Sequence, residues 1–279
     1  DTLLRHADQA MYIAKQTGRN RYHLYDAAND LRARSHHELL QQMRRGLEQG
    51  DFELYFQPQV EMLSRRMVGV EALIRWHHPQ RGLLLPNEFL RAIENTELEI
   101  ELGDWVVTRA YRQMRQWRDA GHDFEVSINI SAFHLQSSDF VPKLRRLVQN
   151  CCVQPCQHCL KIEVLETAAL DDIEAVSAII KACREFGVGF ALDDFGTGYS
   201  SLTYLSNLDV DTLKIDQSFV RDMLDEKGDH AIVQGIIALA KAFDRSIVAE
   251  GVENEAHYAA LLHMGCEVGQ GFGIAPPMP

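Results

Sequence analysis

The chain has 279 residues, with 28 Lys and Arg against 40 Asp and Glu, a net charge of −12, and 46% hydrophobic residues. This length and composition are typical of a globular protein with its own core, and they exclude a disulfide-stapled miniprotein and a low-complexity chain. The acidic balance argues against non-specific binding to a nucleic-acid polymer, which needs clustered cations. If the ligand is anionic, something other than the overall charge of the chain must bind it, and a bound metal ion is the obvious candidate.

The N-terminal segment has its own pattern. Leu3–Lys15 carries apolar residues at helical spacing and Gly18 ends it, Arg21–Tyr25 alternates like a short strand, and 26–37 is polar, as in a linker or linker helix. We expect a domain remnant at 1–26, a linker at 27–37 and a domain at 38–279. Because the chain starts without Met, we expect it to be a piece of a longer protein.

The sequence gives no sign of a membrane segment. No apolar run approaches the roughly 20 residues that span a bilayer, and the first residues lack the pattern of a signal peptide. We therefore expect a cytoplasmic domain, with membrane attachment of the parent protein left open.

From residue 38 onward, short apolar runs alternate with helical patterns. The expected strands are Phe52–Val60, Met67–Ile74, Phe124–Ile130, Leu160–Leu165, Val188–Leu192, Thr212–Ile215, Ser246–Ala249 and Glu267–Gln270. The expected helices are Pro86–Ala120 with a break near Asn95, Asp139–Asn150, Asp172–Phe186, His230–Phe243 and Glu255–Met264. Repeated βα units predict an α/β fold, a TIM (β/α)8 barrel, with an open doubly wound sheet as the alternative.

The first two strands should depart from a regular barrel. Only Glu61–Arg66 joins them, which is too short for a crossover helix. They should form a hairpin, so we expect a modified barrel with one antiparallel strand.

Polar side chains stand at or near the C-terminal ends of seven of these strands, where the chemistry of such a barrel is found. They are Glu71, Asn129, Glu163, the pair Asp193 and Asp194, Lys214, Glu250 and Gln270. Each one alone would more simply be a salt-bridged or edge residue, but seven at corresponding places are different. Carboxylates gathered in one cavity repel one another unless cations neutralise them. Five carboxylates balance two divalent ions and one Lys, and oxygen ligands favour Mg²⁺ or Mn²⁺.

Two such ions about 4 Å apart activate a water and clamp the oxygens of a displacement at phosphorus, so phosphodiester hydrolysis is the leading chemistry. Adjacent Asp193 and Asp194 allow the first to bridge both ions. Arg75 is placed to grip a substrate phosphate, although alone it could equally be a surface residue. The glycines of Gly196-Thr197-Gly198 suggest a lid that orders the metal ligands, and Ser200 or Ser201 can cap the next helix.

Eight ordered motifs resemble the EAL-domain family of cyclic di-GMP phosphodiesterases over roughly 38–279. They are Gln57-Pro58, Glu71-Ala72-Leu73-Ile74-Arg75-Trp76, Asn129-Ile130-Ser131, Glu163-Val164-Leu165-Glu166, Asp193-Asp194-Phe195-Gly196-Thr197-Gly198-Tyr199-Ser200, Lys214-Ile215-Asp216, Ala249-Glu250-Gly251-Val252-Glu253 and Gln270-Gly271-Phe272. The resemblance implies hydrolysis of cyclic di-GMP to linear pGpG with two Mg²⁺ or Mn²⁺ ions.

The resemblance also implies a role for each matching residue. One metal would be held by Glu71, Asn129, Glu163 and Asp193, and the other by Asp193, Asp194 and Glu250. The catalytic set would be Lys214, which positions or helps activate the water, with Gln270 near it, Glu250, and Glu166, which steadies the glycine loop. Substrate contacts would come from Gln57, Glu71, Leu73, Arg75, Asn129 and Asp216.

The sequence departs from the family pattern at two positions, and the same resemblance also implies further domains and a dimer partner. Leu165 stands where the family usually has Thr, and Phe272 replaces the common Tyr. The first 26 residues resemble the C-terminal end of a GGDEF diguanylate cyclase domain without its signature loop. The resemblance implies upstream GGDEF and sensory domains in the parent protein, and a homodimer formed near Asp193–Ser201.

A cyclic di-GMP receptor without activity is the alternative function, because many relatives keep the barrel and lose metal ligands. Here all five carboxylates are present, which favours the enzyme.

The cysteines leave a separate question open. Four of the six lie between 151 and 159, and they could be reduced thiols, a zinc site or disulfides. We favour reduced thiols. We also expect Trp105 and Trp117 to pack in the core rather than stack on a nucleobase.

Overall fold

Eight strands close into a barrel in the computed structural model, which describes residues 2–16, 22, 27–151, 159–198 and 202–279. Their order around the barrel is β1 (Phe52–Glu61), β9 (Val268–Gly269), β8 (Ser246–Ala249), β7 (Thr212–Ile215), β6 (Gly189–Phe195), β5 (Leu160–Leu165), β4 (Glu125–Asn129) and β2 (Arg66–His78). Pairing of β1 with β2 closes the ring, so the barrel prediction is confirmed and the open-sheet alternative is wrong.

Strand β1 is the antiparallel member of the barrel. It pairs antiparallel with both β2 and β9, while the pairs from β2 through β4 to β9 are parallel. The predicted hairpin is therefore confirmed. A ninth strand, β3 (Gly82–Leu84), pairs antiparallel with the end of β2 outside the ring, and its three residues were too few to be recognised in the sequence.

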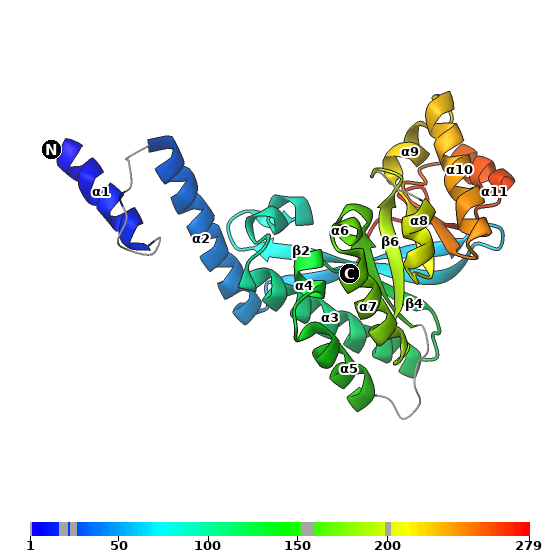
Figure 1. Cartoon of the computed structure of the whole chain (residues 1–279), viewed down its shortest axis with the longest axis horizontal. Coiled ribbons are helices and arrows are strands. Elements are labelled where there is room, and N and C mark those ends of the chain that lie inside the picture. Colours follow the sequence, from blue (N-terminus) through cyan, green and yellow to red (C-terminus); the bar gives the residue numbers. More distant parts are fainter. Residues whose placement is uncertain (1, 17–21, 23–26, 152–158, 199–201) are drawn as a thin grey trace.

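The long helices lie outside the barrel (Figure 1). They are α3 (Glu97–Asp119), α5 (Phe140–Cys151), α7 (Ile173–Arg184), α10 (Lys227–Ala242) and α11 (Glu255–Met264), as expected from the sequence. The predicted break near Asn95 is confirmed. Two 3₁₀ turns (Pro86–Glu88 and Leu90–Ala92) precede it, and Asn95 itself is left-handed with φ 58°.

Four short helices were not expected from the sequence. They are α4 (Ala132–Leu135), α6 (Glu166–Asp171), α8 (Leu202–Asn207) and α9 (Gln217–Asp222), and each follows a strand of the barrel. One or two turns of helix carry too few residues for a hydrophobic period to be recognised. They lie at the end of the barrel at which the predicted site residues are found.

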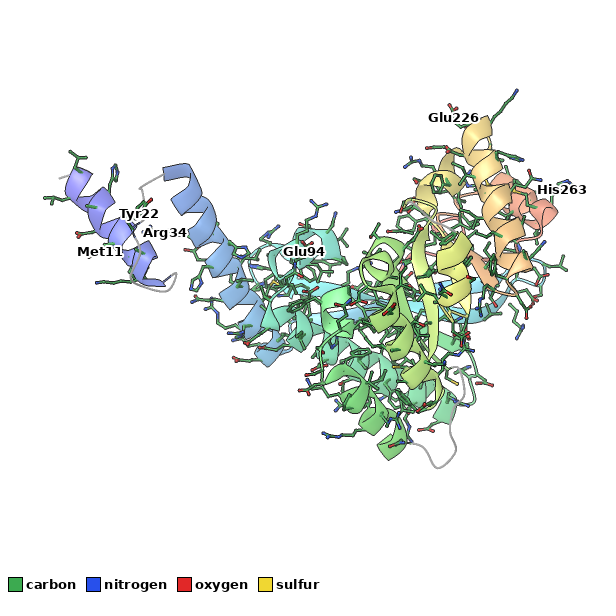
Figure 2. All side chains as sticks on the ribbon, in the orientation of Figure 1. Met11, Tyr22, Arg34, Glu94, Glu226 and His263 are labelled. Carbon is green, nitrogen blue, oxygen red and sulfur yellow. The ribbon has the colours of Figure 1, made fainter. Side chains whose placement is uncertain are left out.

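The N-terminal elements are α1 (Thr2–Gln16) and α2 (Ala27–Gln49). Figure 1 shows α1 and the start of α2 lying away from the barrel, and Figure 2 labels Met11 on α1. The C-terminal part of α2 packs on the barrel domain, because Met43 is fully buried there. Helix α2 runs without a break through the expected boundary at residue 37, and the expected strand Arg21–Tyr25 lies, apart from Tyr22, outside the described residues.

The core lies inside the barrel and between the barrel and its helices. Strands β5, β6 and β7 are buried along almost their whole length, as parallel strands covered by helices are. Trp105 and Trp117 pack against this core, as expected. The polar residues that interrupt these strands are therefore buried as well.

Two further findings concern the cysteines and the membrane. Cys183 and Cys266 are buried free thiols, but Cys159 is disulfide-bonded, so the expectation of reduced thiols is wrong for that residue. Cys152 and Cys156 lie outside the described residues. Across the described part of the chain, none of the helices has both the length and the apolar content to cross a bilayer.

Two glycines give opposite predictions for stability. A Cβ on Gly271 would lie 2.3 Å from the Val252 backbone nitrogen, whereas a Cβ on Gly235, exposed in α10, meets nothing within 4 Å. Gly271→Ala should lower the free energy of unfolding by about 1–3 kcal/mol because backbone must move. Gly235→Ala should raise it by about 0.5–1 kcal/mol. Urea unfolding of both variants checks this, and equal effects would contradict it.

Candidate active site

The register of the barrel strands brings distant parts of the sequence into one layer. Asn129 on β4 lies directly beside Glu163 on β5, and Leu165 at the end of β5 lies beside Asp193 on β6. Across the antiparallel pair, Gln57 on β1 faces Glu71 on β2. The carboxyl ends of the parallel strands thus converge on one mouth of the barrel, as the sequence predicted.

Lys214 on β7 lies at the centre of this mouth and is only 1% exposed. Its Nζ lies 2.6 Å from Glu163 Oε2, 2.7 Å from Glu250 Oε1, 3.0 Å from Asp193 Oδ1 and 3.5 Å from Glu71 Oε2. Four of the five predicted carboxylates therefore surround one ammonium group. A single positive charge faces four acidic groups, so the described side chains leave an excess of negative charge.

The pKa values reflect this imbalance. Burial raises the pKa of Glu163 well above its usual value, against the pull of Lys214. Burial raises the pKa of Glu250 to about 8, helped by the nearby Asp193. Burial opposes the charge of Lys214, but the carboxylates outweigh it and raise the pKa of Lys214 well above its usual value. The crowding of carboxylates therefore makes protonation of Glu163 and Glu250 easier than in water.

Glu71 is the exception among the carboxylates. Burial acts to raise the pKa of Glu71, but Lys214 and hydrogen bonds from two amides outweigh it, and the pKa is lowered. Asn129 Nδ2 donates to Glu71 Oε1 at 2.6 Å, and Gln270 Nε2 donates to Glu71 Oε2 at 2.5 Å. Both oxygens of Glu71 are therefore fixed in position.

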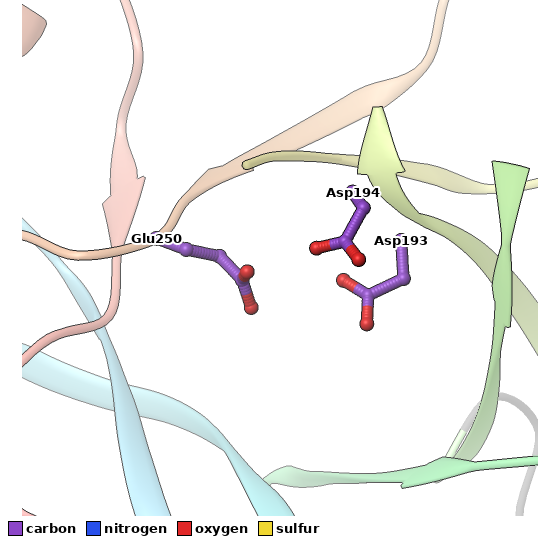
Figure 3. Close-up of side chains that lie close together, drawn as sticks. All are labelled: Asp193, Asp194 and Glu250. Atoms are coloured by element: carbon purple, nitrogen blue, oxygen red, sulfur yellow. The ribbon is translucent and has the colours of Figure 1, made fainter. Parts of the chain in front are cut away.

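Asp193, Asp194 and Glu250 form a second group at the same mouth. They offer carboxylate oxygens that all lie within 4.8 Å of one another, and Figure 3 shows the three side chains converging from the end of β6 and the segment after β8. Successive side chains of a strand normally point to opposite faces. Here Asp194 is left-handed with φ 52° and the pairing of β6 with β7 shifts between Leu192 and Phe195, so both aspartates can face the group.

The residues present fit divalent cations. Glu163 Oε1 is buried and accepts no hydrogen bond from any described donor. Burial, together with Asp193, raises the pKa of Asp194 to about 7. Mg²⁺ and Mn²⁺ prefer oxygen ligands, and this group offers carboxylate oxygens without His or Cys among them.

Glu166 supports the glycine loop beside this group. It is 1% exposed at the start of α6, and its Oε2 accepts hydrogen bonds from the backbone N–H of Gly196 at 2.9 Å and of Gly198 at 3.3 Å. Leu165, the departure from the family pattern noted in the sequence, is 47% exposed, and both of these hydrogen bonds are present beside it. Tyr199, Ser200 and Ser201, which complete the predicted lid, lie outside the described residues.

Three of the predicted substrate-contact residues make their contacts away from Lys214. Arg75 is buried, donates to the Ile74 carbonyl at 2.9 Å and lies over the Tyr55 ring at 5.4 Å. Asp216 caps α9 by accepting a hydrogen bond from the Ser218 N–H at 3.0 Å, and it also helps to raise the pKa of Asp194. Leu73 is half-buried on β2, one position before Ile74. None of the three touches Lys214 in the contacts of the described residues.

Sequence reasoning missed one residue of the site. Gln59 is 4% exposed and its Nε2 donates to Gln270 Oε1 at 2.9 Å. Its position two residues after Gln57 on the same strand was the available signal, because residues at i and i+2 share a face.

Comparison with known proteins accords with this geometry. The family model described as the EAL domain matches residues 40–277. The chain belongs to the EAL-domain family. The bifunctional diguanylate cyclase/cyclic di-GMP phosphodiesterase MucR of Pseudomonas aeruginosa is 41% identical over 278 residues, covering 99% of this chain and 40% of MucR. The cyclic di-GMP phosphodiesterase PdeR of Escherichia coli is 34% identical, covering 99% of this chain and 42% of PdeR.

A solved structure described as the PaMucR phosphodiesterase in complex with c-di-GMP superimposes with a TM-score of 0.83 and 42% identity. It covers 87% of this chain and 98% of that structure. The EAL-domain chain therefore spans about two fifths of the length of these two curated relatives but nearly the whole of this solved domain.

The raised pKa values predict how pH affects the metal-free chain. Between the usual carboxyl value of 4.5 and about 8, folded Glu250 binds a proton that the unfolded chain has released. The free energy of unfolding should therefore fall as the pH rises from about 6 to 8.5 in the presence of a chelator. Urea unfolding at both pH values measures it, with Glu250→Gln as the variant that should flatten the decline. A rise with pH would contradict the assignment.

Proposed function

We propose that this chain hydrolyses cyclic di-GMP to linear pGpG and so lowers the level of this second messenger in bacterial signalling. The observation that carries the proposal is the convergence of Glu71, Glu163, Asp193 and Glu250 on Lys214 at the mouth of an EAL barrel. It is supported by relatives that are named as cyclic di-GMP phosphodiesterases and by the solved MucR complex with that dinucleotide.

Two divalent ions would be held by the acidic groups. Glu71, Glu163, Asp193 and the side-chain oxygen of Asn129 would hold one ion, since the Asn129 nitrogen is used on Glu71. Asp193, Asp194 and Glu250 would hold the other, with Asp193 shared between them. When bound, two Mg²⁺ or Mn²⁺ ions supply an activated water and positive charge for the phosphate oxygens.

The chain's own groups would then position the reactants. Lys214, held by four carboxylates, would orient the attacking water, with Gln270 beside it. Glu166 would keep the glycine loop, and with it Asp193 and Asp194, in place. Gln57, Leu73, Arg75 and Asp216 would contact the dinucleotide, and the buried guanidinium of Arg75 suits a bidentate grip on phosphate.

The assembly belongs to the proposal as well. We expect a homodimer formed through the loop and helix near Asp193–Ser201, and upstream GGDEF and sensory domains in the parent protein. Part of that loop lies outside the described residues.

Glu71→Ala should abolish turnover, because it removes a metal ligand whose two oxygens are both fixed by amides. The assay incubates the purified chain with cyclic di-GMP and Mg²⁺ or Mn²⁺, with a chelator control, and separates the products by chromatography. Turnover by Glu71→Ala equal to that of the wild type would overturn the assignment. A wild type that binds cyclic di-GMP without hydrolysing it would instead be a receptor.

Asp193→Asn should lower turnover at least as much as Glu71→Ala, because it removes negative charge from both metal positions. The direct measurement is the stoichiometry of bound Mn²⁺, which should fall below that of the wild type. Full stoichiometry in this variant would rule out the bridging role of Asp193.

A further inference from the structure

A chain of amide side chains lies behind Glu71. Gln59 Nε2 donates to Gln270 Oε1 at 2.9 Å, and Gln270 Nε2 donates both to Glu71 Oε2 at 2.5 Å and to Gln57 Oε1 at 3.0 Å. Gln57 Nε2 in turn donates to the Ala275 carbonyl at 3.1 Å. All three glutamines are at most 7% exposed, so water cannot easily replace these bonds.

The direction of this chain has one consistent solution. An ionised carboxylate only accepts hydrogen bonds, so Gln270 must present its NH₂ group to Glu71. The Gln270 oxygen then faces Gln59, which must present its own NH₂ group. Among the described residues, Gln59 donates the one hydrogen bond that this oxygen accepts, so losing it would leave a buried carbonyl unsatisfied or let the amide rotate.

The backbone makes room for this contact. Gln59 lies opposite Gly69 in the β1–β2 pair, and a Cβ on Gly69 would come within 2.9 Å of Gln59 Oε1. Val60, next to Gln59, pairs with Gly269 on β9, which places Gln270 beside β1. The glycine at 69 and the short strand β9 thus bring the Gln59 and Gln270 amides together.

We propose that Gln59 is a positioning residue that fixes the orientation of the Gln270 amide and, through it, the metal-binding carboxylate of Glu71. The inference rests on the proposed function. It goes further by assigning a role to a residue outside the metal and substrate sets. Hydrogen-bond partners behind metal ligands typically change metal affinity about 10–100-fold when they are lost.

The test is a double-mutant cycle on Mn²⁺ affinity, measured by titration calorimetry with MnCl₂ on the full chain. Gln59→Met should weaken Mn²⁺ binding about tenfold, and Gln59→Met/Gln270→Met should be no weaker than Gln270→Met alone. Gln116→Met, an exposed position on α3, is the matched control and should bind like the wild type. Affinity of Gln59→Met within twofold of the wild type, or losses that multiply in the double variant, would overturn the inference.

Gly69→Ala is the second variant, for the case that Gln59→Met does not fold. It keeps every donor, and its Cβ would come within 2.9 Å of Gln59 Oε1 and 3.3 Å of the Glu125 carbonyl oxygen. Because the closer contact displaces the Gln59 amide, this variant should also weaken Mn²⁺ binding, and unchanged affinity would count against the inference. Cyclic di-GMP turnover is measured alongside. A wild type without turnover whose Gln59→Met variant still loses Mn²⁺ affinity refutes the proposed function alone, whereas an active wild type with an unaffected variant refutes this inference alone.

Discussion

The contact between Lys214 and its four carboxylates governs the mouth of the barrel. One buried ammonium cannot balance this many acidic groups, and desolvation prevents water from doing so. Burial among these groups raises the pKa values of Glu163 and Glu250. A group of carboxylates of this kind is suited to small divalent cations, because each ion would remove repulsion between them.

The barrel makes this crowding possible. Closure through the antiparallel strand β1 pairs every strand of the ring on both sides, so Glu71, Glu163, Asp193 and Lys214 stand on strands that are held at both edges. The irregular elements are placed where they serve the site: the left-handed Asp194 turns two consecutive carboxylates to one side, and short helices follow β4 through β7 at the same end. Rigid strands carry the ligands, and local irregularities aim them.

The sequence was sufficient to predict the main architecture and most of the residues that lie together at the mouth of the barrel. Buried parallel strands have apolar sequences. A charged residue within such a sequence, such as Lys214, is therefore easy to recognise. Strand β3 and the short helices were missed because three to six residues carry no resolvable period. Gln59 was missed for another reason. A glutamine near a strand end is most simply a surface residue, and the spacing from Gln57 shows that Gln59 shares its face, but the contact with Gln270 follows from the pairing of β1 with β9.

The two oxygens of Glu71 show how fixed positions are built from neutral groups. Further cations around this carboxylate would compete with metal, whereas amides hold it without adding charge. Two glutamines, Gln270 and Gln57, connect Glu71 to the Ala275 carbonyl, in the segment whose Met278 pairs with Phe56 on β1. The C-terminal segment is thereby tied to the mouth of the barrel through the Gln270 amide, which donates to Glu71 on one side and to Gln57 on the other, so a change in its orientation disturbs both bonds.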